Sequence, residues 1–189
     1  YGAEAARLIA NQPKLRPITV IGNDYVALPA YQGRAVGGAL RWKLNLIRLE
    51  NPQQTRQLET VHEGLVTALA ANADGTRLAS ADLQGNVFVW DLAGEPNRTP
   101  TVLNAAPCAL SLCFSPDGKT LVVGTAVAVE TQQSQVQIWD VAAGKLLRSR
   151  TLPDHVNACA VSPDGKMLAY SGGRDHEISL GPLTAAEPV

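Results

Sequence analysis

One pattern recurs along most of this chain: an apolar strand, a short polar turn, a second apolar strand and an alternating strand. It occurs in VTALAANADGTRLASADLQGNVFVWDL (66–92), ALSLCFSPDGKTLVVGTAVAVETQQSQVQIWDV (109–141) and VNACAVSPDGKMLAYSGGRDHEISLGPL (156–183). Such self-similarity, with a period of about 40 residues, is typical of arrays in which each unit packs only against its neighbours. The repeat therefore restricts the chain to a row of similar small units.

A fourth, more diverged copy precedes these units. NLIRLENPQQTRQLETVHEGLVTALAA can be laid over ARLIANQPKLRPITVIGNDYVALPA at an offset of 40 residues, which places Val66 on Val26. The positions equivalent to Trp90 are then spaced by 40, 40, 49 and 42 residues: Ala10, Glu50, Trp90, Trp139 and Gly181. An insertion, roughly AVETQQSQ, between the second and third strands of its unit explains the long interval.

Each unit is predicted to contain four short strands joined by tight turns. The turn SPDGK occurs at 115–119 and 162–166, and NADGT at 72–76 is the same turn without the proline. Proline presets φ for a turn, and an Asp-Gly pair accepts the positive φ that closes it. The third strand of each unit alternates, as in Val136 and Ile138 against Gln137, which indicates a strand with two different faces.

Two Trp-Asp pairs, Trp90-Asp91 and Trp139-Asp140, each end an alternating strand that follows a matching turn. In this combination the units resemble WD repeats, the four-stranded blades of a β-propeller. The resemblance implies an all-β fold, a β-propeller segment of about four four-stranded antiparallel blades that is part of a seven- or eight-bladed ring. The chain is then a single partial propeller with repeats at approximately 14–51, 55–91, 99–140 and 145–183.

The strand order predicts that both ends of the chain fall inside blades. The chain is expected to open on a third strand, ARLIA, and an outer strand, PITVI, and to stop after a third strand at Leu180, giving about seventeen strands. The first residues lack an initiator Met and a signal-peptide layout, so we expect the numbering to begin inside a longer product or after processing. The remaining blades are expected from the same chain or another copy, and the isolated polypeptide is expected to self-associate.

The resemblance also implies a structural tetrad. In WD repeats a His before the inner strand, a Ser or Thr on the second strand, an Asp in the next turn and the Trp are hydrogen bonded. Only the unit from His62 to Trp90 keeps both ends, and Asp82 and Gln84 stand where Ser and Asp are usual. We assign His62, Asp82 and Trp90 to this tetrad and expect its network to be weak or absent. The other units have different residues at the His position: Gly22, Ala105 and Leu152.

Two loops contain the best candidate contact residues: Arg174, Asp175, His176, Asp154 and His155. The resemblance places both loops on one rim of a blade. Two His with two Asp have the chemistry to bind a divalent metal or to act as acid and base, and they are equally suited to a hydrogen-bonded loop cluster. Contact with a partner protein is the third interpretation, with Arg174 and the histidines as anchors.

Two further features have open interpretations. Trp42, between Arg41 and Lys43 on a strand interpreted as the second of its blade, either packs between blades or is an exposed recognition residue. The polar insertion is either a solvated hairpin extension or a contact element.

Composition excludes several classes of partner. With 16 basic and 17 acidic residues the chain has no broad basic field, so we expect neither nucleic-acid nor membrane binding. No segment approaches the ~18 apolar residues of a membrane span. Cys108, Cys113 and Cys159 lie in apolar runs without metal-ligand spacing, which favours free thiols and a cytoplasmic location.

These observations favour a non-enzymatic WD-repeat scaffold that mediates protein–protein or protein–peptide interaction. No catalytic motif, cofactor site or metal site is predicted. By analogy, such a segment is the sensor or assembly region of a larger signalling or effector protein. The alternative is an accessory or catalytic propeller of a hydrolase, which requires Asp154, His155, Asp175 and His176 to converge on a cleft. A third possibility is a purely structural ring without an outside ligand.

Overall fold

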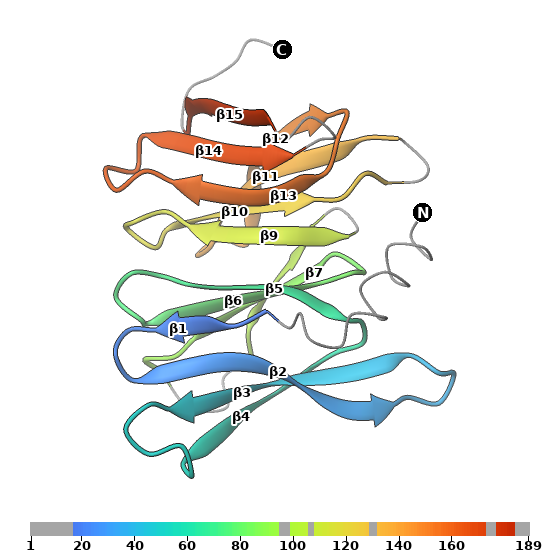
Figure 1. Cartoon of the computed structure of the whole chain (residues 1–189), viewed down its shortest axis with the longest axis vertical. Coiled ribbons are helices and arrows are strands. Elements are labelled where there is room, and N and C mark those ends of the chain that lie inside the picture. Colours follow the sequence, from blue (N-terminus) through green and yellow to red (C-terminus); the bar gives the residue numbers. More distant parts are fainter. Residues whose placement is uncertain (1–16, 95–98, 106–107, 129–131, 173–176, 184–189) are drawn as a thin grey trace.

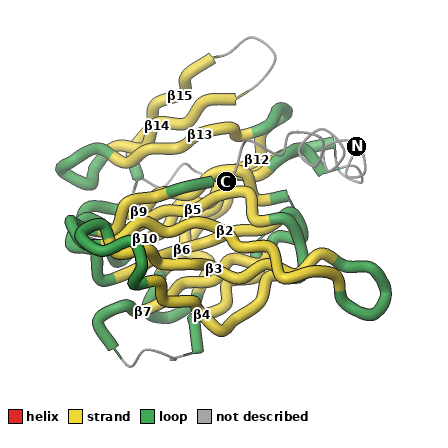
Figure 2. The backbone as a smooth tube through the Cα atoms, turned by 60° about the horizontal axis from the view of Figure 1, so that its bottom comes forward, coloured by secondary structure: helices red, strands yellow, loops and turns green. Residues whose placement is uncertain are grey.

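A computed structural model describes residues 17–94, 99–105, 108–128, 132–172 and 177–183. These residues form fifteen β-strands and the loops that join them. The strands are arranged in four antiparallel sheets that lie one upon another (Figure 1). Figure 2 shows the same residues from another side, as strands and loops throughout. The predicted all-β class and the segment of about four antiparallel blades are confirmed, and three strands of the fourth blade are described.

Each sheet is built from consecutive strands. The first contains β1 (Thr19–Ile21), β2 (Tyr25–Arg34), β3 (Leu40–Arg48) and β4 (Thr55–His62). The second contains β5 (Val66–Ala71), β6 (Arg77–Asp82), β7 (Asn86–Asp91) and β8 (Thr101–Asn104). The third contains β9 (Ala109–Phe114), β10 (Thr120–Thr125), β11 (Ser134–Asp140) and β12 (Lys145–Leu152). The fourth contains β13 (Val156–Val161), β14 (Met167–Gly172) and β15 (Glu177–Pro182).

The predicted Asp-Gly turns join the first and second strands of three sheets. Gly75, Gly118 and Gly165 have φ of 71°, 67° and 71°, a region that glycine enters without steric cost. In the SPDGK turns the serine hydroxyl bonds the aspartate carboxylate, and both groups bond backbone amides further along the turn. The turn chemistry expected from the sequence is therefore present.

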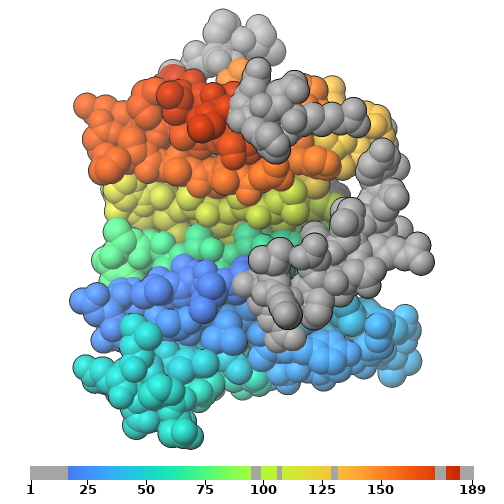
Figure 3. Space-filling model, viewed as in Figure 1, coloured from blue at the N-terminus to red at the C-terminus, as the bar shows by residue number. Residues whose placement is uncertain are grey.

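Apolar side chains fill the three seams between the sheets. Each seam is formed by residues that alternate along the strands, so one face of a sheet packs on the sheet before it and the other on the sheet after it. The space-filling view shows the sheets as contiguous layers (Figure 3). Buried residues of the seams include Leu44 and Trp90 in the first, Val87 and Leu121 in the second, and Val122 and Tyr170 in the third.

The inner strands β5, β9 and β13 approach one another closely (Figure 1). Hydroxyl groups connect them: Thr67 Oγ1 donates to the Ala109 carbonyl, and Ser111 Oγ donates to the Val156 carbonyl at 3.3 Å. Gly124 on β10 lies under this contact, because a Cβ built there would be 2.4 Å from Ser111 Oγ and 2.5 Å from Val156 Cγ1. Small residues at these positions are therefore required for close packing.

Among the described residues, nothing covers the two outer faces of the stack. On the fourth sheet, Ile178 and Leu180 are 72% and 70% exposed. Their partners on β14, Ser171 and Ala169, alternate with the buried Leu168 and Tyr170. Ile178 and Leu180 therefore lie on the face that points away from the third sheet. On the first sheet, Val20 is 57% exposed while adjacent Ile21 is buried in the first seam. Both end sheets thus present apolar side chains to solvent.

The prediction for the start of the chain is wrong in one respect. PITVI is not the outer strand of a preceding blade, because Thr19–Ile21 pairs with β2 as the inner strand of the first sheet. This shift makes β3, which contains Trp42, the third strand of its sheet and not the second. The physical reason is that β2 and β3 form one long hairpin through the turn at 35–39, a segment that the sequence interpretation had placed inside a strand. ARLIA lies outside the described residues.

We expect Gly124→Ala to lower the free energy of unfolding by about 1–3 kcal/mol, because the added methyl group overpacks the seam between the third and fourth sheets. Gly181→Ala is the matched control, since nothing lies within 4 Å of a Cβ built there. Urea unfolding of the two variants beside the parent chain measures the difference. Equal stabilities for the two variants would show that the seam is not tightly packed at Gly124.

Candidate functional site

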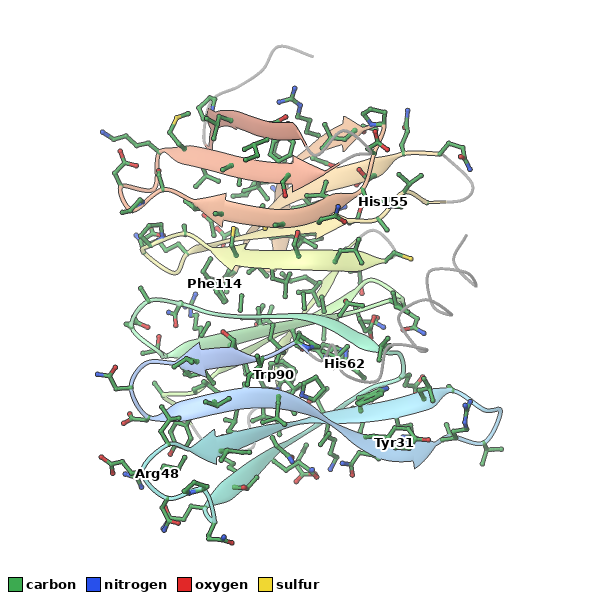
Figure 4. The ribbon with its side chains drawn as sticks, in the orientation of Figure 1. Tyr31, Arg48, His62, Trp90, Phe114 and His155 are labelled. Atoms are coloured by element: carbon green, nitrogen blue, oxygen red, sulfur yellow. The ribbon has the colours of Figure 1, made fainter. Side chains whose placement is uncertain are left out.

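The best candidate for a contact surface is one end of the stack, which we call the hairpin rim. It comprises the turns between second and third strands and the connections from one sheet to the next, of which the structure describes 35–39, 63–65, 83–85, 105, 108, 126–128, 132–133 and 153–155. Figure 4 shows Tyr31 and His155 at this end, and Arg48 and Phe114 at the opposite end. All these segments meet on one side because the strands of every sheet run antiparallel in chain order.

The β2–β3 hairpin extends beyond the other turns of the rim (Figure 1). β2 and β3 have 10 and 9 residues, whereas the equivalent β6 and β7 have 6 each. A β-bulge lies between Tyr31 and Gly33, where Gly33 has a φ of 107°. Bulges of this kind bend a strand and reorient the neighbouring side chain.

Tyr31 and Val36 are the apolar side chains that this hairpin exposes. Tyr31 is 48% exposed, and its ring centroid lies 5.3 Å from that of Trp42, so the ring is supported from behind. Val36 at the tip is fully exposed, and the tip is closed by hydrogen bonds from Ala35 N to Ala39 O and from Gly38 N to Ala35 O. The hairpin therefore presents a pre-ordered aromatic ring and an aliphatic tip.

The hairpin is also cationic. Residues 25–48 contain four Lys and Arg residues and no Asp or Glu. Lys43 pairs with Glu59 at 2.7 Å, and Arg48 lies 3.9 Å from Glu50. Arg34 and Arg41 are exposed, and Arg34 Nη1 donates to the Gly38 carbonyl at 2.8 Å. The tip consequently attracts negative charge.

Trp42 does not serve as an exposed recognition residue. It is 7% exposed and belongs to the first seam, together with Leu44, Val66 and Trp90. Its burial fits the interpretation as a residue that packs between blades. Tyr31, which sequence reasoning did not select, is the exposed ring beside it. The Gln-Gly pair that follows Tyr31 at the bulge was the sequence signal that could have indicated this position.

His62 lies at the centre of a buried hydrogen-bonded network below the rim. Its Nδ1 lies 2.9 Å from Asp82 Oδ2, and its Nε2 lies 2.5 Å from Ser80 Oγ, with His62, Ser80 and Asp82 all fully buried. Because a carboxylate accepts, Nδ1–H donates to Asp82 and Nε2 accepts from the Ser80 hydroxyl in the neutral tautomer. Phe88 stacks on the imidazole at 4.4 Å, and Trp90 lies edge-on at 6.3 Å.

Asp82 extends this network into the rim. Its Oδ1 accepts from the Gln84 and Asn86 backbone amides, each at 3.0 Å, and its Oδ2 accepts from Asn86 Nδ2 at 3.0 Å. The expectation of a weak or absent network is wrong for this blade, because Asp82 binds both the His and the turn. Sequence reasoning also missed Ser80, although its position two residues before Asp82 on a strand puts both side chains on one face.

In the third sheet a different polar chain replaces the His network. The Trp139 indole donates to Gln137 Oε1 at 3.2 Å, and Gln137 Nε2 donates to Gln135 Oε1 at 2.7 Å. Ser149 Oγ on the outer strand also donates to Gln135 Oε1 at 3.1 Å. The buried indole N–H is thereby satisfied without a histidine.

The insertion is fixed at its base by both neighbouring turns. It occupies 126–133, slightly earlier than predicted, since Ser134 and Gln135 belong to β11, and residues 129–131 lie outside the described part. Ala126 N donates to the Cys108 carbonyl at 2.8 Å, and Val127 N donates to His155 Nδ1 at 2.8 Å. The Ser134 hydroxyl donates to the Asp154 carbonyl.

These contacts give His155 a positioning role at the base of the insertion. Its Nδ1 accepts the Val127 amide, so only Nε2 faces other groups. Arg174, Asp175 and His176 lie outside the described residues. Two of them, Asp175 and His176, are needed for the convergence that a hydrolase site requires. Within the part of the chain that is described, no group of three or more His, Cys, Asp and Glu side chains could hold a metal ion.

A shallow groove of about 250 Å³ lies between the second and third sheets. Its lining includes Arg77, Trp90 and Asp91. Arg77 also donates from Nη1 to the Gly118 carbonyl at 2.9 Å, a contact between the two sheets. The groove is therefore part of the packing between blades. Among the described residues, no helix has the length and apolar character to cross a membrane.

The repeats match a known family. The profile of the WD domain, G-beta repeat, matches residues 53–91, 101–140 and 146–180, more than half of the chain. The chain belongs to the WD-repeat family. The matched segments begin with the outer strand of one sheet and end with the third strand of the next, so each WD repeat spans two blades.

The chain is also similar to individual WD-repeat proteins. It is 29% identical over 145 residues to protein groucho of Drosophila melanogaster, covering 73% of this chain and 19% of that protein. It is 32% identical over 123 residues to transducin-like enhancer protein 2 of Mus musculus, covering 61% of this chain and 15% of that protein. The chain thus spans less than a fifth of the length of these relatives.

The fold of a solved WD40 domain matches as well. The WD40 domain of Toxoplasma gondii coronin superposes with a TM-score of 0.68 at 20% sequence identity. The match covers 88% of this chain and 42% of the coronin domain. The described sheets therefore have the arrangement of blades in a β-propeller.

We expect Asp82→Ala to lower the free energy of unfolding by about 3 kcal/mol, because it leaves His62 and two turn amides without their acceptor in a buried site. Asp164→Ala removes an exposed turn carboxylate and is the matched control, with a much smaller loss expected. Chemical denaturation with Trp fluorescence as the probe compares the two. A loss at Asp82 no greater than at Asp164 would contradict the importance of the network.

Proposed function

We propose that this chain is a non-enzymatic scaffold that binds a protein or peptide segment at the hairpin rim. The observation behind the proposal is the β2–β3 hairpin, which combines an exposed, supported Tyr31 with an exposed Val36 and two exposed arginines. Tyr and Arg are the side chains most enriched at the centres of protein interfaces. Membership of the WD-repeat family supports the same class of function.

The partner that fits this hairpin is a segment with acidic and apolar side chains. Arg34 and Arg41 favour carboxylates, and the absence of Asp and Glu from residues 25–48 leaves no competing acid on the hairpin itself. Tyr31 and Val36 offer apolar area that a short aliphatic or aromatic side chain covers. The overall charge of −1 supports a protein partner over nucleic acid or a membrane surface.

Other rim residues complete the proposed surface. Asp154 and His155 lie beside the insertion, and Arg174, Asp175 and His176, outside the described residues, follow β14 in the sequence. We include all five as contact candidates, with the insertion as a second contact element. A cytoplasmic location, supported by three cysteines that form no disulfide with one another, and a role as sensor or assembly region of a larger signalling or effector protein are parts of the same proposal.

The test is selection of peptides from a displayed random library on the immobilised chain, followed by affinity measurement on the variants. Peptides rich in Asp or Glu beside apolar residues are expected, and Tyr31→Ala or Arg34→Gln is expected to weaken their binding at least tenfold, or about 1.4 kcal/mol. Leu147→Ala and Lys145→Gln make equivalent changes on exposed β12 and are the matched controls. Equal weakening by the controls would refute the hairpin as the binding element.

We also propose that further blades cover the two uncovered outer faces and complete a ring, supplied by a longer chain or by a second copy. The exposed Ile178 and Leu180 on one face and Val20 on the other support this proposal, because edge sheets of a propeller are protected by closure.

Size exclusion with light scattering tests this second proposal on the 20.0 kDa chain. Association is expected, and Ile178→Thr combined with Leu180→Thr is expected to reduce it, whereas Leu147→Thr, at a residue 56% exposed on β12, is expected to leave it unchanged. A discrete dimer favours a second copy, and larger heterogeneous species favour blades from a longer chain. A single species at 20.0 kDa for the parent chain would overturn the proposal.

A further inference from the structure

Two of the three cysteines meet across the seam between the third and fourth sheets. Cys113 lies on β9 and Cys159 on β13, the adjacent inner strands of these sheets. Both side chains pack against the same buried cluster, which includes Val122, Val156 and Tyr170. They are partly exposed and remain free thiols in this structure.

The register of the strands brings the two sulfurs together. Cys113 pairs with Val122 on β10, and Cys159 Sγ lies 3.9 Å from the carbonyl oxygen of the same Val122. Cys113 and Ser111, two residues apart on β9, lie on the same face of the strand, and Ser111 contacts Val156 of β13. Disulfide formation therefore joins two side chains that point into the same seam, without bringing distant elements together.

The surroundings distinguish the two thiols chemically. The Cys113 thiol and the Ser111 side chain lower the pKa of Cys159, against the opposing effect of burial. The Cys159 side chain and burial raise the pKa of Cys113. These opposite directions favour Cys159 as the attacking thiolate of the pair.

We propose that Cys113 and Cys159 form a peroxide-sensitive dithiol that closes to a disulfide between the third and fourth blades. The oxidant is hydrogen peroxide. The site takes a small oxidant because both sulfurs lie within a seam and not on an open surface.

The reaction proceeds in two balanced steps. The Cys159 thiolate attacks the peroxide, so that an S–O bond forms, the O–O bond breaks and, with one proton, water leaves. The Cys113 sulfur then attacks the sulfenic sulfur of Cys159, so that the S–S bond forms, the S–O bond breaks and the thiol proton leaves with the hydroxide as a second water. In sum, two thiols are oxidised to one disulfide and one peroxide is reduced to two waters.

The disulfide would connect the rim as well as the seam. β9 follows the turn of Cys108, and β13 follows Asp154 and His155, the two turns that hold the base of the insertion. A covalent bond between β9 and β13 fixes the spacing of these turns.

Cys108 provides an internal reference for this chemistry. It lies in the turn before β9, with a φ of 60°, and its backbone carbonyl accepts from Ala126 N. It belongs to neither the buried cluster of the third seam nor the thiol pair. General oxidation of cysteines would modify Cys108 as well, whereas the proposed reaction spares it.

The experiment treats the reduced chain with micromolar hydrogen peroxide, blocks remaining thiols with N-ethylmaleimide and identifies the products by intact mass and tryptic mapping. The expected product has lost two hydrogens, contains one blocked thiol instead of the three cysteines of the sequence, and yields a peptide linked through Cys113 and Cys159. The parent chain alone gives this result, so it does not depend on the folding of a variant.

Two variants assign the roles of the thiols. Cys113→Ser is expected to leave a sulfenic acid at Cys159 that dimedone traps, whereas Cys159→Ser is expected to make Cys113 unreactive at the same peroxide concentration. Cys108→Ser is the control and retains the disulfide. Linkage through Cys108, equal oxidation of all three cysteines, or persistence of both thiols under peroxide that oxidises Cys108 would each overturn the proposal.

Discussion

The structure depends on each sheet burying its faces against the sheets beside it. No sheet of this chain has a core of its own, because apolar residues alternate between two faces and each face is filled from the neighbouring sheet. The close approach this demands explains the small side chains at the inner strands, such as Gly124 between Ser111 and Val156. It also explains why, among the described residues, the two end sheets expose apolar side chains on their outer faces.

Polar groups supplement this packing where the sheets meet the rim. His62, on the last position of the first sheet, is bound by Ser80 and Asp82 of the second, so the connection between the sheets is fixed by a buried network. At the third seam, His155 does the equivalent at the surface by accepting the Val127 amide. The described part of the rim is thus held at its base by hydrogen bonds. Rigid support of this kind favours binding by exposed side chains such as those of the β2–β3 hairpin.

Sequence reasoning predicted the repeating sheets and their turns because those are set locally, by strand alternation and by Asp-Gly pairs with positive φ. It misplaced the first sheet, since Thr19–Ile21 has the composition of an inner or an outer strand and only its pairing with β2 decides. It selected Trp42 over Tyr31 because burial of a ring depends on the neighbouring sheet. It also missed the role of Ser80, although the spacing of two residues between Ser80 and Asp82 places both side chains on one face of the strand.

The two roles of Asp82 in the second blade restrict how this sequence can change over time. Asp82 accepts from His62 and also holds the amides of Gln84 and Asn86, while the Ser80 hydroxyl bonds the other ring nitrogen of His62. Replacing Asp82 by Ser would leave a single hydroxyl oxygen in place of the two carboxylate oxygens that accept from the imidazole and from the turn. A change at this one position therefore alters the link between the first two sheets and the turn before β7 at the same time.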